Sequence, residues 1–230
     1  MKVPRAFYNE TGMLMTIADV LSSVLLAETE SALRLLRFDN GRSSAGSAAR
    51  LVKHNDQARA GATLTLLGER VGRALREHPV FDLAVRPRAL TPLVFSRYRP
   101  GQAYGSHVDN ALMDGLRTDV SFTLFLSDPE SYEGGELVID SPAGEDAIKL
   151  PAGHLVAYPS TALHRVAPVS GGERLACVGW AQSWIRDPAR RELLFDLDTA
   201  RQTLFARHGK TAESDMLAKT SANLVRMWAE

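Results

Sequence analysis

The spacing of apolar residues changes twice along the chain, and this change restricts the fold more than any other feature. Between about residues 88 and 185, apolar and β-branched residues occur in short runs separated by Gly, Pro, Asp and Ser. The run TDVSFTLFLS alternates and places four apolar side chains on one face: Val120, Phe122, Leu124 and Leu126. Comparable runs are GGELVID, AIKL, HLVAYPS and RLACVGWAQSW. Many short strands at such intervals predict a β-sandwich or a small barrel.

Helices are predicted on both sides of this region. Leucines at near-helical spacing predict one helix over residues 16–37, and a second apolar series predicts another over 61–78, which Pro79 ends. The tail begins with Asp187 at an N-cap position and Pro188 at the first helical position, and a glycine lies near the end of its apolar pattern. We therefore expect a mainly β core with flanking α-helices.

Length, charge and cysteine content exclude several classes of protein. A chain of 230 residues suits one domain, or one domain with helical additions. The 27 basic and 27 acidic residues balance, so we expect no nucleic-acid partner. No apolar run is long enough to span a membrane, and the N-terminus lacks a secretory pattern, which predicts a cytoplasmic protein without a membrane partner. The single cysteine, Cys177, excludes an intrachain disulfide and a cysteine-based zinc cluster.

Residues 104–111, YGSHVDNA, contain a histidine and an aspartate two positions apart. In an extended chain the side chains alternate between faces, so His107 and Asp109 would point the same way and can share one metal ion. On a helix the two side chains would diverge by about 200° and could not easily share it. The stretch lies in the β region, which favours the extended conformation.

A third candidate metal ligand, His164, lies on a remote predicted strand in YPSTALHRVAPV. Two histidines and one carboxylate match the facial triad of non-haem iron(II) oxygenases, which leaves metal positions open for a cosubstrate and oxygen. Arg174 follows ten residues later. Its planar guanidinium suits the far end of a dicarboxylate cosubstrate, because it binds a carboxylate bidentately.

The cosubstrate hypothesis carries one geometric condition. If PVSGGER formed a flat hairpin turning at Gly171–Gly172, Arg174 would pair with Val169 and lie about 16 Å from His164, which is too far for a small diacid. The strands of His164 and Arg174 must therefore lie in opposite sheets that face each other across the pocket.

At these residues the sequence resembles the iron(II)/2-oxoglutarate-dependent dioxygenases, specifically the bacterial PKHD-type (prolyl/lysyl-hydroxylase-domain) hydroxylases. The similarity runs from near Met13 to the C-terminus. Its most specific blocks are RYRPGQAYGSHVDNA, TLFLSDPESYEGGELVI, KLPAGHLVAYPSTALHRVAPV and RLACVGWAQSWIRDPARRELL. The resemblance implies a double-stranded β-helix (jelly-roll) core of two facing sheets. It also implies iron(II) bound by His107, Asp109 and His164, with 2-oxoglutarate anchored by Arg174.

The implied activity is hydroxylation of a C–H bond, with conversion of 2-oxoglutarate and O2 to succinate and CO2. Halogenating relatives have a small residue in place of the metal-binding carboxylate, so Asp109 favours hydroxylation. Analogy with prolyl hydroxylases implies that Tyr98 donates its hydroxyl to the far carboxylate of 2-oxoglutarate and that Trp180 walls the same pocket. Aromatic residues in β cores are, however, as often purely structural. The resemblance also adds ascorbate as a candidate cofactor and links bacterial members with iron uptake.

The resemblance divides the chain into four predicted regions. Residues 1–12 form an extension that relatives lack, 13–87 a helical region that supports the core, 88–185 the dioxygenase domain, and 186–230 a C-terminal helical region. The terminal helices either cap the core or form a dimer interface, so the sequence is compatible with a monomer and with a homo-oligomer. His154 stands where relatives more usually have an acidic residue.

Two other functions are compatible with the same residues. A cupin-like sensor would bind iron and 2-oxoglutarate without turnover. A zinc-dependent hydrolase would use the three ligands to activate water, although such an enzyme has no need of Arg174. The substrate, a small molecule or a peptide, is not indicated by any motif.

Overall fold

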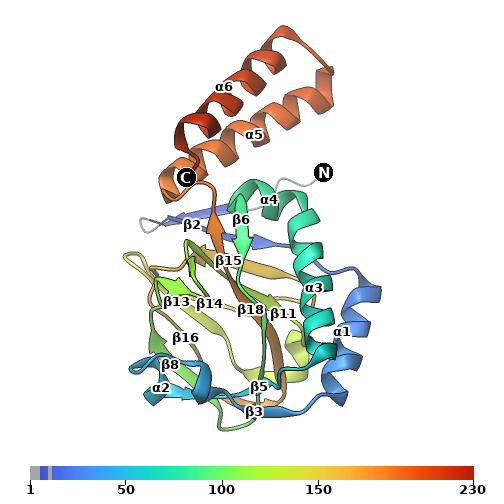
Figure 1. The fold of residues 1–230 in the computed structure, drawn as a ribbon, viewed down its shortest axis with the longest axis vertical. Coiled ribbons are helices and arrows are strands. Elements are labelled where there is room, and N and C mark those ends of the chain that lie inside the picture. The colour runs from blue at the N-terminus through green and yellow to red at the C-terminus, as the bar shows by residue number, and fades with distance from the viewer. Residues whose placement is uncertain (1–5, 10–11) are drawn as a thin grey trace.

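Antiparallel strands form the centre of the molecule, and helices lie beside them and at one end (Figure 1). The computed structural model describes residues 6–9 and 12–230. The helices are α1 (Ser23–Leu35), α2 (Ala49–Val52), α3 (Ala62–Glu77), α4 (Pro79–Val85), α5 (Pro188–His208) and α6 (Ala212–Trp228), with short 3-10 turns at η1 (Gly41–Ser44) and η2 (Pro129–Ser131). The prediction of a mainly β core with flanking helices is confirmed.

The larger sheet has nine strands. Their order is β1-β2-β15-β11-β18-β7-β5-β3, and β6 pairs with the C-terminal end of β18. The strands are β1 (Ala6–Asn9), β2 (Gly12–Ile17), β3 (Phe38–Asn40), β5 (Asp56–Ala58), β6 (Pro87–Leu90), β7 (Val94–Tyr98), β11 (Val120–Phe125), β15 (Leu155–Pro159) and β18 (Arg174–Ser183). Neighbouring strands run antiparallel, and β11 pairs with both β15 and β18 at the centre of the sheet.

The smaller sheet has five strands in the order β14-β13-β16-β8-β4, and two further pairs, β9–β10 and β12–β17, form ribbons. The strands are β4 (Lys53–His54), β8 (Ala103–His107), β9 (Leu112–Met113), β10 (Leu116–Arg117), β12 (Tyr132–Gly134), β13 (Leu137–Ser141), β14 (Gly144–Ile148), β16 (His164–Val166) and β17 (Val169–Gly172). Tyr98 and Phe125 of the larger sheet pack with Leu137 and Val166 of the smaller one in a single buried cluster. The two sheets therefore face each other, as the jelly-roll prediction requires.

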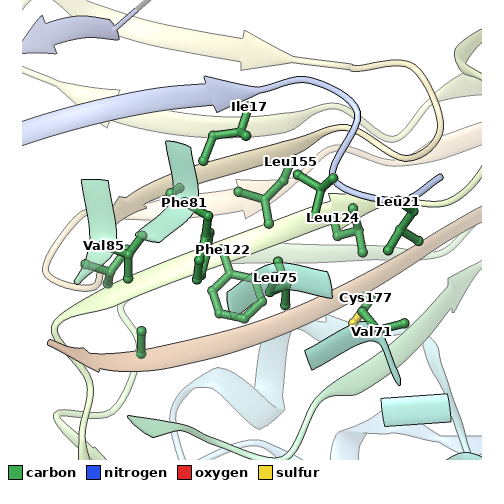
Figure 2. Close-up of a cluster of buried hydrophobic side chains, with 14 of the residues drawn as sticks. Ile17, Leu21, Val71, Leu75, Phe81, Val85, Phe122, Leu124, Leu155 and Cys177 are labelled. Carbon is green, nitrogen blue, oxygen red and sulfur yellow. The ribbon is translucent and has the colours of Figure 1, made fainter. Parts of the chain in front are cut away.

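The main hydrophobic core lies on the other face of the larger sheet, between the sheet and the helices (Figure 2). The four residues predicted to share one face of a strand, Val120, Phe122, Leu124 and Leu126, all belong to this core. Helices α3 and α4 supply the opposing side chains, among them Val71, Leu75, Phe81 and Val85. The rings of Phe81 and Phe122 meet edge to face with centroids 5.5 Å apart. This packing holds the larger sheet on one side and leaves its other face to the interior of the jelly roll.

The helices begin and end near the predicted residues, with one exception. The first helix was expected to start at residue 16 but begins at Ser23, with the Ser22 side chain accepting from the backbone N–H of Leu25 at 3.2 Å. Residues 15–17 instead extend β2 and pair with β15. Pairing with a remote strand thus overrides the local helical spacing. Pro79 ends α3 as predicted and also occupies the first position of α4.

The N-terminal region of residues 13–87 was expected to be helical, but it also contributes strands to both sheets. β4 pairs with β8 of the smaller sheet, and β5 pairs with β7 of the larger one. This region therefore forms part of the wall of the jelly roll as well as supporting it. Of the predicted extension, residues 1–5 and 10–11 lie outside the described residues, while β1 pairs with β2.

Helices α5 and α6 form an antiparallel pair that extends away from the sheets (Figure 1). α5 begins as predicted, with the Asp187 side chain accepting from the N–H of Arg190 at 3.0 Å, and ends at Gly209, whose φ is +69°. An ion pair between Arg86 and Asp198 anchors α5 to the end of α4. In the described part of the chain, no helix has the length and apolar character needed to cross a membrane.

Candidate metal centre and cosubstrate pocket

The three predicted metal ligands come together on the inner side of the smaller sheet. His107 is the last residue of β8 and His164 the first of β16, and the two are cross-strand partners. Asp109 lies two residues beyond His107, and Val108 between them is 49% exposed while both flanking side chains are buried. The backbone thus alternates as an extended chain does, and His107 and Asp109 point the same way.

The spacing of these side chains suits a single metal ion. His107 Nε2 lies 3.8 Å from Asp109 Oδ1, and His164 Nε2 lies 3.8 Å from Asp109 Oδ2. One ligand atom from each residue lies within 4.8 Å of the others. One transition-metal ion with bonds of about 2.1 Å can bridge each 3.8 Å separation. The donor set of two imidazoles and one carboxylate is the one expected for non-haem iron(II).

Backbone carbonyls hold both imidazoles in the tautomer that a metal requires. His107 Nδ1 donates to the carbonyl of Gly105 at 2.9 Å, and His164 Nδ1 donates to the carbonyl of Ala162 at 3.0 Å. A carbonyl can only accept, so Nε2 of each ring keeps its free electron pair for a metal. Burial, together with the neighbouring His164, lowers the pKa of His107 to about 4. The ring is therefore neutral, the form that binds metal, over the physiological pH range.

Two serines that sequence analysis missed hold the carboxylate of the centre. Ser121 Oγ donates to Asp109 Oδ2 at 2.6 Å and lies 2.8 Å from Ser160 Oγ, so Ser160 can in turn donate to Ser121. Both serines are buried. The alternation of β11 contained this information, because Ser121 lies on the face opposite to Phe122 and Leu124. Such contacts orient a metal ligand and tune its affinity.

Arg174 is a buried cation, and no carboxylate of the described residues forms an ion pair with it. Only 1% of the residue is exposed, and its Nε and Nη2 atoms have no hydrogen-bond partner among the described residues. Its guanidinium carbon lies 5.2 Å from the ring centroid of Tyr98 and 5.3 Å from that of Phe125. An unpaired buried charge is costly, so this arrangement indicates an anionic ligand.

The geometric condition on Arg174 is met. β17 pairs with β12, whereas Arg174 begins β18, which pairs with β7 and β11 in the larger sheet. Gly171 and Gly172 therefore end β17 and do not form a hairpin turn, and β17 and β18 are not partners. His164 and Arg174 lie in opposite sheets, as the cosubstrate hypothesis demands.

Tyr132 is a second polar group near Arg174 that sequence analysis did not single out. Its hydroxyl is buried beside the Arg174 guanidinium and forms no well-aligned hydrogen bond with a described residue. Burial raises its pKa, and the nearby Arg174 cation opposes this rise. Gly135 makes room for both side chains: its φ is +69°, and a Cβ atom there would lie 3.0 Å from Arg174 Cδ and 3.2 Å from Tyr132 Cε2. The YEGG sequence before β13 was the available sign of this close approach.

A cavity of about 420 Å³ opens onto the candidate metal centre. The three metal ligands line it, together with Tyr98 and Trp180. Tyr98 pairs with Arg174 across β7 and β18, and burial raises the pKa of its hydroxyl, which therefore stays protonated. Trp180 points to the same side of β18 as Arg174, but six residues of strand place it about 20 Å away, so it walls the cavity far from the guanidinium. His154 does not line the cavity; it lies in the turn before β15.

Comparisons with known proteins agree with this geometry. The profile of the 2OG-Fe(II) oxygenase superfamily matches residues 93–182, and that of the PKHD-type hydroxylase C-terminal domain matches residues 188–230. A PKHD-type hydroxylase of Picosynechococcus sp. is 52% identical over 219 residues, covering 95% of this chain and 100% of the relative. A PKHD-type hydroxylase of Synechococcus elongatus is 53% identical over 223 residues, with the same coverage of both chains. These matches confirm the resemblance stated from the sequence.

Solved structures share the fold at low sequence identity. A prolyl-4-hydroxylase of Pseudomonas putida superposes with a TM-score of 0.52 at 23% identity and covers 75% of this chain and 94% of its own. HygX from Streptomyces hygroscopicus, with nickel and 2-oxoglutarate bound, gives a TM-score of 0.56 at 14% identity and covers 76% of this chain and 85% of its own. The predicted jelly-roll architecture is thereby confirmed.

Proposed function

The chain belongs to the PKHD-type hydroxylases of the 2OG-Fe(II) oxygenase superfamily, and we propose that it binds iron(II) through His107, Asp109 and His164 and 2-oxoglutarate through Arg174. It is an oxidoreductase whose family uses iron(II), 2-oxoglutarate and O2. The zinc-hydrolase alternative finds no support in these relationships.

The donor geometry supports the assignment of the metal ligands. His107 and His164 each direct Nε2 toward the Asp109 carboxylate while Nδ1 donates to a backbone carbonyl, and Ser121 holds that carboxylate by its Oδ2. Bound iron(II) supplies the activation of O2 that is coupled to conversion of 2-oxoglutarate to succinate and CO2. The protein residues orient the two cosubstrates at the centre, and the buried walls of the cavity limit the access of water.

The observation that most strongly supports a dioxygenase is the buried guanidinium of Arg174, for which the described residues supply no counter-ion. The carboxylate of 2-oxoglutarate that does not bind the metal would supply that counter-ion. The buried hydroxyl of Tyr132, which lies beside Arg174, adds a second donor for the same carboxylate. Tyr98 lies between Arg174 and the cavity and completes the anchoring group in this proposal.

The test is the visible spectrum of metal-free protein after addition of iron(II) and 2-oxoglutarate without oxygen. The wild type should develop a charge-transfer band. Asp109→Ala should weaken or shift the band, and Arg174→Ala should require far more 2-oxoglutarate to produce it. Arg165→Ala is a matched control, because Arg165 of the central strand β16 pairs with Glu145 of β14 on the face of the smaller sheet opposite to the metal ligands. A wild type without a band at saturating concentrations would refute the proposal.

Turnover separates the hydroxylase from the non-catalytic sensor. After oxygen is admitted, the hydroxylase should convert 2-oxoglutarate to succinate. The sensor should bind iron and 2-oxoglutarate but form no succinate. Five points stay predictions from the sequence: a small-molecule or peptidyl substrate, the link with iron uptake, the use of ascorbate, a homo-oligomer and the cytoplasmic location.

A further inference from the structure

One short segment of the chain passes from the smaller sheet to the larger one beside the candidate metal centre. Residues 53–54 form β4, which pairs with β8, and residues 56–58 form β5, which pairs with β7. Side chains alternate along this extended segment. Lys53, Asn55 and Gln57 line the cavity.

The alternate residues of the segment face outward and are paired there. The imidazole of His54 lies 2.9 Å from Arg42 Nη2. Asp56 forms ion pairs with Arg97 and Arg99. The outward face therefore accounts for the stability of the segment, and the three polar residues on its inward face require a separate explanation.

Lys53 is a second buried cation at the cavity. It is 6% exposed, its ammonium donates to Ser44 Oγ at 2.9 Å, and it lies 5.0 Å from the ring centroid of Tyr104. No carboxylate of the described residues forms an ion pair with it. Burial lowers the pKa of Lys53 to about 8, and the charge of Asp109 opposes this. A buried ammonium of this kind gains stability when an anion binds beside it.

Asn55 adds an unsatisfied amide to the same wall. It is 2% exposed; the Tyr98 hydroxyl lies close enough to interact with its side chain, and neither Oδ1 nor Nδ2 forms a well-aligned hydrogen bond with a described residue. Buried polar groups almost always have partners, so an amide left unpaired at a cavity indicates a ligand that pairs with it. One ammonium and one amide N–H match the two oxygens of a carboxylate.

On the proposed placement of 2-oxoglutarate, this anion is a different molecule. One carboxylate of 2-oxoglutarate is assigned to the metal and the other to Arg174, which does not itself line the open cavity. Lys53 lines the cavity, and neither carboxylate of 2-oxoglutarate is assigned to it. We propose that Lys53 and Asn55 bind a carboxylate of the primary substrate, so that the hydroxylated compound is a small carboxylic acid. This inference rests on the proposed function of the metal centre, which supplies the reaction.

The cavity volume agrees with a small substrate. About 420 Å³ lies near the lower end of the range for small-molecule sites, and 2-oxoglutarate must share that space. Gln57, the third inward-facing residue, offers both a donor and an acceptor for a further polar group of the same compound.

Lysine NMR tests the proposal without knowledge of the true substrate. The chain has five lysines, so protein labelled at the lysine side chains gives a simple spectrum, and loss of one resonance in Lys53→Met assigns Lys53. The protein is loaded with 2-oxoglutarate and with zinc(II) as a diamagnetic substitute for iron. Acetate is the probe, acetamide the uncharged control, and ionic strength is held constant because salt screens charges.

Acetate should move the titration midpoint of Lys53 to higher pH, because a neighbouring carboxylate favours the ammonium form. Acetamide should not move it, and the exposed Lys219 should respond to neither probe. Asn55→Leu should weaken acetate binding about 10- to 100-fold, as expected for one hydrogen bond to a charged group.

Two results would overturn the inference. If acetate acts no differently from acetamide, Lys53 is a structural cation packed on Tyr104. Lys53 belongs to the cosubstrate site if acetate shifts its titration midpoint only before 2-oxoglutarate is added. The same conclusion holds if Lys53→Met weakens the binding of 2-oxoglutarate as much as Arg174→Met does. Failure of the proposed function would appear separately, as absence of the iron charge-transfer band in the wild type.

Discussion

The two faces of the larger sheet carry different kinds of side chain on the same strands. In β11, Val120, Phe122 and Leu124 pack against the helices, as Figure 2 shows for Phe122 and Leu124, whereas Ser121 and Thr123 line the cavity. In β18, Cys177 belongs to the apolar core, whereas Arg174 faces the interior as a buried cation that forms no ion pair with a described residue.

This difference shows how one sheet separates stability from chemistry. The helix-facing side is closely packed and apolar, so its residues contribute to folding through burial. The inner side contains buried polar groups that satisfy one another or await a ligand, and such groups contribute little to folding. Substitutions of neighbouring residues on one strand should therefore have effects of different kinds.

The largest effect is expected from Leu124→Ala on the packed face. Leu124 is fully buried in the core, and loss of a buried leucine side chain costs about 2–5 kcal/mol of the free energy of unfolding. Urea denaturation followed by circular dichroism measures this loss. The affinity of the remaining folded protein for 2-oxoglutarate should not change, and a parallel loss of affinity would show that the two faces are not independent.

Arg174→Met should produce the opposite result. Affinity for 2-oxoglutarate should fall about 30-fold or more, because one partner of a buried charged pair is removed. The free energy of unfolding should stay the same or rise, since a buried charge without a partner is replaced by an apolar chain. The charge-transfer titration and urea denaturation give the two values. A large loss of stability without loss of affinity would make Arg174 a structural residue.

Ser121→Ala should affect the metal more than the fold. Loss of the hydrogen bond to Asp109 should weaken metal binding by about 10- to 100-fold, as is typical for residues that orient a metal ligand. Competition with a chelator measures the affinity. Thr123→Val is the matched control, because Thr123 is the next inward-facing residue of β11. Equal effects of the two substitutions would assign the loss to general packing of the cavity wall.

Cys177 should give the smallest effect, visible in the pH dependence of stability. Burial raises the pKa of its thiol far above the ordinary value of 9.0. The unfolded chain ionises near pH 9 and the folded chain does not, so this group stabilises the protein below that pH and the contribution is lost as pH rises. The difference in unfolding free energy between wild type and Cys177→Ala should therefore decline between pH 8 and 10, by up to about 1.4 kcal/mol per pH unit. A constant difference would contradict the burial of the thiol.

Local sequence patterns predicted most of the strands and the later helices. The runs around Phe122, Val138, Val156 and Cys177 all lie in strands, and Asp187 caps α5 as expected. The pattern failed at residues 16–22, because pairing of β2 with β15 is a long-range interaction that helical spacing does not record. The short strands β3, β4 and β5 were missed for the same reason, since they depend on partners more distant in sequence.

The candidate site divides in a similar way. The HxD spacing, His164 and Arg174 were identifiable because their residue types are specific to metal and carboxylate chemistry. Five other residues of the site could not be identified, because each residue type is common and its importance depends on what lies opposite to it in the fold. They are Ser121, Ser160, Tyr132, Lys53 and Asn55. A lysine next to a histidine is ordinary in a sequence; it becomes informative only when its ammonium is buried beside a cavity and no carboxylate of the described residues forms an ion pair with it.

The sequence by itself determined which side chains share a face, because alternation along a strand is a local property of the extended backbone. It thereby placed His107 beside Asp109 and Phe122 beside Leu124. Only the tertiary structure decided which faces meet. It brought His164 beside His107, set Arg174 in the opposite sheet and directed Lys53 and Asn55 into the cavity, because distances between remote strands are set by the packing of the whole fold.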